Sequence, residues 1–96
     1  MIEERYFANT IGGHNKDYRM VIDWDSNTLD CIWGPIDGSK RHDHFTPETE
    51  QDLTNLVSEK VNRRFRNGYS LISCTDMSME FDADIQELRS AERLAG

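Results

Sequence analysis

The sequence of 96 residues lacks several features that would assign it to a class directly. It has no apolar run long enough to span a membrane, and no basic segment followed by an apolar run opens it. We therefore expect no membrane partner and no signal peptide. Its two cysteines, Cys31 and Cys74, lie in apolar, strand-like contexts without the spacing of a zinc site. We expect a cytoplasmic protein in which both are buried free thiols.

Sequence signals of catalysis and of cofactor binding are also missing. No Ser or Cys lies in a recognisable nucleophile setting, no glycine-rich loop opens a helix, and no carboxylate pair has neighbours that would tune it. His42 and His44 share one face of an extended segment, but two ligands without a third make a weak metal site. A solvated loop is the better interpretation of these histidines. We expect no enzyme, no metal and no cofactor.

Basic residues are fewer than acidic ones, 11 against 18, and the net charge of −7 argues against a general DNA clamp. Residues 1–35 contain six acids and three bases, residues 36–75 six of each, and residues 76–96 six acids and two bases. The acidity therefore lies at the two ends of the chain. At 36% hydrophobic residues the chain is apolar enough to fold, and its length predicts one domain with a small core.

Short segments in which apolar and polar residues alternate predict an antiparallel sheet. The clearest places Tyr18, Met20 and Ile22 on one face, and the polar turn over residues 25–28 predicts a hairpin with the next strand. A polar loop is expected over residues 37–44. The expected strands are residues 3–10, 18–24, 29–33 and 69–74.

Residues 46–67 carry the signals of one main amphipathic helix. Thr46 is a suitable N-cap, Pro47 occupies the first helical position, and acids fill the first turn. Asn67 and Gly68 supply a left-handed stop. The apolar stripe consists of Leu53, Leu56, Val57, Val61 and Phe65.

These elements predict an α+β fold, in which a small antiparallel sheet of about four strands is packed by the helix over residues 46–67. The domain is expected to occupy residues 1–75. Residues 76–96 form an acidic C-terminal extension, for which we expect an edge strand over 77–81 and a short helix over 82–94.

Three motifs of the chain occur in the order typical of one known family. Asn15-Lys16 with Tyr18-Arg19 opens a predicted strand, Trp33-Gly34-Pro35 ends another, and Asn67-Gly68-Tyr69 follows the helix. Over about residues 5–73 the chain therefore resembles a WGR domain. The resemblance implies a small antiparallel sheet with one helix across a face. It also implies a non-catalytic role, since WGR domains of DNA-dependent poly(ADP-ribose) polymerases contact a DNA end.

In this resemblance Trp33 is the aromatic residue that contacts the DNA end, although it is equally compatible with packing inside a turn. The motif arginine is replaced by Pro35, which carries no charge and donates no hydrogen bond, so one charge-assisted phosphate contact is missing. Other cations are candidates to replace it, although those at the helix end also complement the helix dipole. They are Lys40, Arg41, Arg63, Arg64 and Arg66.

We therefore expect a WGR-like binding module that acts on nucleic acid or within a nucleic-acid-processing complex. The alternative is an acidic protein–protein module or inhibitor, of the kind a phage encodes, which occupies a basic nucleic-acid-binding surface on a partner. A homodimer through an exposed strand is a third possibility. The alternative contact residues are Asp76, Glu80, Asp82, Asp84, Glu87 and Glu92.

Overall fold

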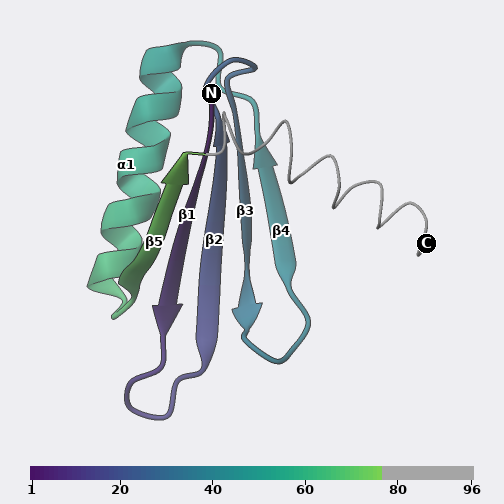
Figure 1. The fold of residues 1–96 in the computed structure, drawn as a ribbon. Coiled ribbons are helices and arrows are strands. Elements are labelled where there is room, and N and C mark those ends of the chain that lie inside the picture. Colours follow the sequence, from purple (N-terminus) through teal and green to yellow (C-terminus); the bar gives the residue numbers. More distant parts are fainter. Residues whose placement is uncertain (77–96) are drawn as a thin grey trace, which may run out of the picture.

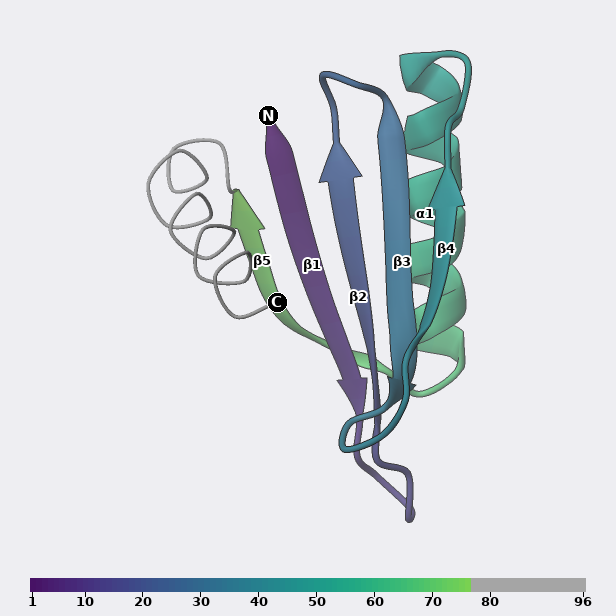
Figure 2. The ribbon, with the colours of Figure 1, turned by 90° about the vertical axis from the view of Figure 1, so that its right-hand side faces the viewer.

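A computed structural model, which describes residues 1–76, contains a five-stranded antiparallel sheet with one helix across a face (Figure 1). The α+β class and the packing of a sheet by one helix are thus confirmed. The strand order is β4-β3-β2-β1-β5, and Figure 2 shows α1 on one side of the sheet. The elements are β1 (Ile2–Asn9), β2 (Lys16–Asp23), β3 (Thr28–Pro35), β4 (Arg41–Phe45), α1 (Glu50–Arg66) and β5 (Ser70–Asp76).

Strand β4 is the element that the sequence did not predict. The expected loop over residues 37–44 is wrong for its second half, and the sheet has five strands within residues 1–76 rather than about four. The strand escaped notice because four of its five residues are polar and exposed. An edge strand needs only one paired neighbour, so β4 forms by pairing with β3 and by placing Phe45 against the core.

The helix begins at Glu50, three residues after the predicted start. Thr49 rather than Thr46 is the N-cap, because the Thr49 hydroxyl accepts a hydrogen bond from the backbone N–H of Asp52 at 3.0 Å. The amide of Asn27 donates to the Pro47 carbonyl at 2.7 Å and to the Thr49 carbonyl at 2.9 Å. This long-range anchor holds the segment before α1 extended, so Pro47 lies outside the helix.

The end of the helix is as expected. Asn67 is the C-cap, and Gly68 has a φ of +86°. The backbone N–H of Gly68 donates to the carbonyl of Phe65, and that of Tyr69 donates to the carbonyl of Arg64. These bonds satisfy carbonyls of the last turn and turn the chain directly into β5.

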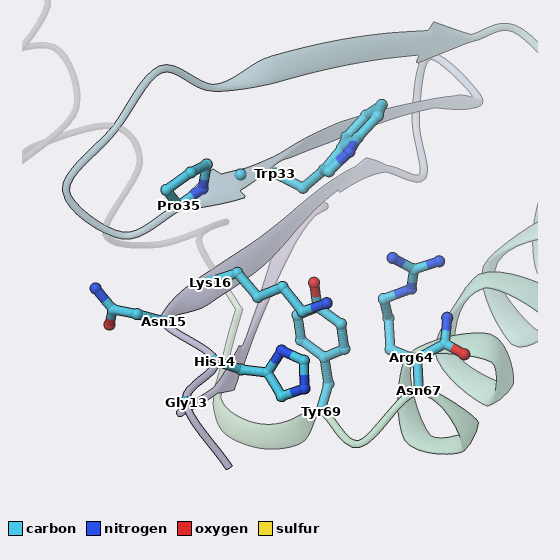
Figure 3. A pocket seen from close by; sticks show the side chains of 10 residues that line it. Gly13, His14, Asn15, Lys16, Trp33, Pro35, Arg64, Asn67 and Tyr69 are labelled. Carbon is cyan, nitrogen blue, oxygen red and sulfur yellow. The ribbon is translucent and has the colours of Figure 1, made fainter. Parts of the chain in front are cut away.

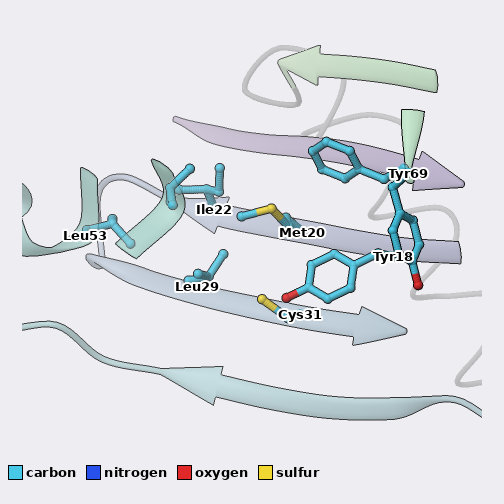
Figure 4. Close-up of a cluster of buried hydrophobic side chains, with 9 residues drawn as sticks. Tyr18, Met20, Ile22, Leu29, Cys31, Leu53 and Tyr69 are labelled. Atoms are coloured by element: carbon cyan, nitrogen blue, oxygen red, sulfur yellow. The ribbon is translucent and has the colours of Figure 1, made fainter. Parts of the chain in front are cut away.

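The core lies between α1 and the face of the sheet that it covers (Figure 4). Antiparallel pairing aligns Phe7, Tyr18 and Trp33 in one row across β1, β2 and β3. Apolar residues of α1 pack against this face of the sheet and complete the core. The buried cluster consists of Phe7, Tyr18, Met20, Ile22, Leu29, Cys31, Leu53, Val57 and Tyr69.

The two cysteines are free, and they differ in burial. Cys31 is buried as expected, whereas Cys74 is exposed. The burial expected for Cys74 is wrong because all of β5 is exposed at the edge of the sheet. The strand and helix expected over 77–81 and 82–94 lie outside the described residues. Within residues 1–76, no helix combines the length and the apolar character needed to cross a membrane.

Replacing the N-cap tests the observed start of α1. We expect Thr49→Ala to lower the free energy of unfolding by about 1 kcal/mol, because the backbone N–H of Asp52 in the first turn loses its acceptor. Thr46→Ala, the matched control, is expected to change it by less than about 0.5 kcal/mol. Urea denaturation measures both, and a larger loss for Thr46→Ala would contradict the assignment.

Candidate functional site

An open cleft of about 660 Å³ lies at one end of the sheet, where β2 and β5 begin and where β3 and α1 end. Figure 3 shows Trp33 and Pro35 on one side of it, and Lys16, Tyr69 and Arg64 on the other. Within residues 1–76, none of the lining residues is acidic, although the sequence contains 18 acids. The lining consists of Gly13, His14, Asn15, Lys16, Trp33, Gly34, Pro35, Arg64, Asn67 and Tyr69.

Aromatic rings form the base of the cleft. Trp33 pairs directly across from Tyr18 in the sheet, and the two rings stack with centroids 5.8 Å apart and an interplanar angle of 28°. Tyr69 meets Tyr18 edge to face at 6.4 Å. Tyr18 is buried, whereas Trp33 is only partly buried. Trp33 therefore packs on the core and also lines the cleft, and its predicted contact with nucleic acid stays a prediction.

The guanidinium of Arg64 lies over two of these rings, with Cζ 4.3 Å from the centroid of Tyr18 and 5.5 Å from that of Tyr69. Arg64 forms no ion pair with any carboxylate among residues 1–76, and its buried Nε has no hydrogen-bond partner there. Lys16 Nζ lies 5.5 Å from the centroid of Tyr69. The cleft thus holds cations by ring contacts and leaves their charge available to an anion.

Burial dominates the ionisation of Tyr18 at this site. It raises the pKa of the Tyr18 hydroxyl strongly, and the nearby charge of Arg64 lowers it by a smaller amount. The hydroxyl stays neutral at any ordinary pH, so Tyr18 adds no negative charge beneath the guanidinium.

The end of β3 and the turn that follows it border the cleft and pack closely on each other. Gly34 has a φ of +151°, and a Cβ at this position would lie 2.6 Å from the carbonyl oxygen of Ser39. The backbone N–H of Ile36 donates to the carbonyl of Asn15 at 3.0 Å, which ties this turn to the β1–β2 loop. The Gly that follows the motif Trp is therefore required by the backbone geometry.

Lys40, one of the predicted contact residues, secures this same turn. Its Nζ donates to Asp17 Oδ1 at 2.8 Å and also to the backbone carbonyls of Pro35 and Ile36. All three hydrogen-bond donors of the ammonium are thus used within the protein, and Lys40 stabilises the turn.

The other predicted cations do not form one group, because they lie on different sides of α1 or on β4. Arg64 lines the cleft, but Arg63 faces Glu59 at 3.9 Å. Arg66 follows the buried Val57 by nine residues, or about two and a half turns, so it lies on the opposite side of α1. Arg41 pairs across from Trp33 on β4, next to the cleft. Of the alternative acidic contacts, Asp76 ends β5 and the others lie outside the described residues.

Of the lining residues that were not among the predicted contacts, three carry an aromatic or ionisable side chain: His14, Lys16 and Tyr69. Lys16 and Tyr69 were within the motifs that carry the WGR resemblance, which was the available signal. His14 had no signal, because only the folded β1–β2 loop brings it to the end of α1.

His42 and His44 are placed against a carboxylate rather than in a solvated loop. The imidazoles of His42, through Nε2, and of His44, through Nδ1, each lie 2.7 Å from Asp30 Oδ1 across the β3–β4 pair. Among residues 1–76, no group of three or more His, Cys, Asp and Glu side chains is arranged to hold a metal ion. These contacts therefore bind the edge strand to the sheet.

Comparison with known proteins supports the fold alone. No protein-family model matches the sequence, and no curated protein is significantly similar to it. Among solved structures, the chain is similar to a Bacteroides fragilis protein solved as a structural genomics target, with a TM-score of 0.64 and 8% sequence identity. The match covers 73% of this chain and 19% of the other, so the shared fold spans a small part of that protein.

Glycine substitutions test the geometry of the turn at the cleft. We expect Gly34→Ala to lower the free energy of unfolding by at least about 2 kcal/mol, because its Cβ would collide with the Ser39 backbone. Gly12→Ala, with a φ of +65° and open space around it, is expected to cost only about 1 kcal/mol. Urea denaturation compares the two variants, and equal losses would contradict the close approach.

Asp30→Asn tests the pH dependence of the β3–β4 contact. Burial raises the pKa of Asp30, but hydrogen bonds from His44 and His42 outweigh it and hold the pKa below its usual value of 3.8. A lowered pKa stabilises the folded state above pH 3.8, and this contribution is lost as the pH falls through the folded-state value.

We therefore expect wild type to lose more stability than Asp30→Asn between pH 5 and pH 2, measured by urea denaturation at each pH. Glu48→Gln, which removes an exposed carboxylate before the helix, is expected to follow wild type. Parallel profiles for wild type and Asp30→Asn would contradict the role of Asp30.

Proposed function

We propose that this protein is a non-enzymatic, WGR-like module that binds nucleic acid, alone or within a nucleic-acid-processing complex, through the cleft at Trp33 and Arg64. The observation that carries the proposal is a cation on aromatic rings that has no anionic partner among residues 1–76, in a cleft whose lining within that range contains no acid. An anion with a flat ring attached matches both features of this lining. Nucleotides combine the two groups in one ligand.

The phosphate is expected to bind beside Arg64. Its guanidinium is oriented by Tyr18 and Tyr69, so little side-chain entropy remains to be lost when an anion binds. Lys16 supplies a second positive charge across Tyr69. Such charge-assisted contacts are worth about 1.5–3 kcal/mol each.

The base or the sugar is expected to bind against Trp33. The inner face of its indole stacks on Tyr18, and the partly exposed remainder lines the cleft. Base–aromatic stacking contributes about 1–3 kcal/mol and tolerates any base. The proposed contact therefore depends little on sequence.

Arg64 offers a reason why Pro35 does not abolish such binding. Pro35 occupies the place of the motif arginine, but it borders the same cleft into which Arg64 projects from α1. The cation of the site would then come from the helix rather than from β3.

Fluorescence anisotropy with labelled single-stranded DNA, blunt duplex DNA and tRNA tests the proposal at low salt. We expect at least one probe to bind more tightly than about 10⁻⁴ M, the weak limit of ordinary non-specific binding. Arg64→Gln is expected to weaken binding at least about tenfold, and Trp33→Leu by a similar factor.

Arg66→Gln is the matched control. Arg66 is two residues after Arg64 in the sequence but lies on the opposite side of α1, so the variant removes the same charge at a position outside the cleft. It is expected to change affinity less than threefold, apart from the general effect of net charge. Thermal melting of each variant separates loss of fold from loss of contact. Absence of binding to all three probes at 100 µM protein, or equal effects of Arg64→Gln and Arg66→Gln, would contradict the proposal.

A further inference from the structure

The strand register places three residues of β4 on the helix-covered face of the sheet. Arg41 pairs with Trp33, Asp43 with Cys31 and Phe45 with Leu29. Residues directly opposite one another in a sheet point to the same face, and Cys31 and Leu29 are buried in the core beneath α1. Arg41 and Asp43 therefore lie on the side of β4 that faces α1, at the edge of the core.

Lys60 faces this strand from the helix. Its Nζ lies 4.7 Å from the ring centroid of Phe45, one helical turn before Arg64 on the same side of α1. Positive charges from Lys60 and Arg64 and the negative charge of Asp43 all act on the Cys31 thiol, whose pKa is raised mainly by burial. The three charged groups thus lie near the Cys31 side chain of β3, close enough to influence its ionisation.

The other sides of the cleft are less suited to a polyanion. Strand β5 carries no basic residue, and its last residue is Asp76. The uncovered face of the sheet presents Asp17 and Asp30, which are already engaged with Lys40 and with the two histidines. The side between β4 and α1 is the one that continues the positive charge of the cleft.

Resting on the proposed function, we infer that a single nucleic-acid strand with one nucleotide at Trp33 leaves the cleft over β4, and that its next phosphates pass between Arg41 and Lys60. Side chains one helical turn apart are separated by about 5–6 Å at Cβ, which suits successive phosphates of one strand. Asp43 is the one acid of β4, it lies on the helix-covered face of that strand, and it opposes binding along this track.

Measurement of the salt dependence of binding to a labelled single-stranded hexanucleotide tests the track. Arg41→Gln and Lys60→Gln are each expected to weaken binding about threefold to tenfold at low salt and to reduce the slope of log affinity against log salt by about 0.7. Lys60→Arg is expected to retain both affinity and slope, which separates charge from packing on Phe45.

Asp43→Asn is the decisive variant, because it is expected to strengthen hexanucleotide binding about threefold. Glu48→Gln removes the same charge from an exposed residue just before α1, at the opposite end of the helix from the cleft, and serves as its control. A labelled mononucleotide, which reaches only the cleft, is expected to respond to Arg64→Gln and to remain unchanged by Arg41→Gln.

The outcomes distinguish the track from the proposed function. If wild type binds and Arg64→Gln weakens binding, while Arg41→Gln and Lys60→Gln match Arg66→Gln and Asp43→Asn matches Glu48→Gln, the track is wrong and the function stands. If wild type binds no nucleic-acid probe, both are overturned.

Discussion

The contact between the Arg64 guanidinium and the ring of Tyr18 links the helix, the sheet and the candidate site. It lies at the last turn of α1, over the aromatic row that Phe7, Tyr18 and Trp33 form across the sheet. The rings offer the cation a negative face, so its charge is held without a carboxylate. A carboxylate partner would have satisfied Arg64 but neutralised the cleft. The same contact thus closes one end of the core and leaves a positive charge accessible.

The net charge of −7 does not describe the surface that matters for binding. Several acids are engaged with bases: Glu3 with Arg5, Asp17 with Lys40, and Glu4 with Arg19. These partly exposed pairs add little stability, but each places a positive charge beside an acid and reduces its field. A chain with an acidic total can therefore present an acid-free cleft, and the field near that cleft is the relevant one for an anion.

Predictions from the sequence succeeded where a local pattern reflects burial. They failed where pairing with, or a hydrogen bond from, a residue distant in the sequence sets the local structure. The period-two pattern around Met20 and the stop at Gly68 appear in the structure as expected. Strand β4 was missed because its exposed polar residues resemble a loop, and the N-cap was misplaced because Asn27 holds Pro47 outside the helix. Of the candidate site, Trp33 and Arg64 were identified from the sequence, whereas Lys40 proved to stabilise the turn between β3 and β4.

The sequence by itself determined the α+β class, the amphipathic face of α1 and the helix stop at Gly68, since each depends on periodicity or on backbone freedom encoded by nearby residues. Only the tertiary structure decided which cations share a site. Arg64 and Arg66 are two residues apart in the chain, yet the helical repeat sends one onto Tyr18 and the other to the opposite side. Likewise, Lys16 and Arg64 meet around Tyr69 because antiparallel pairing brings the ends of distant elements together.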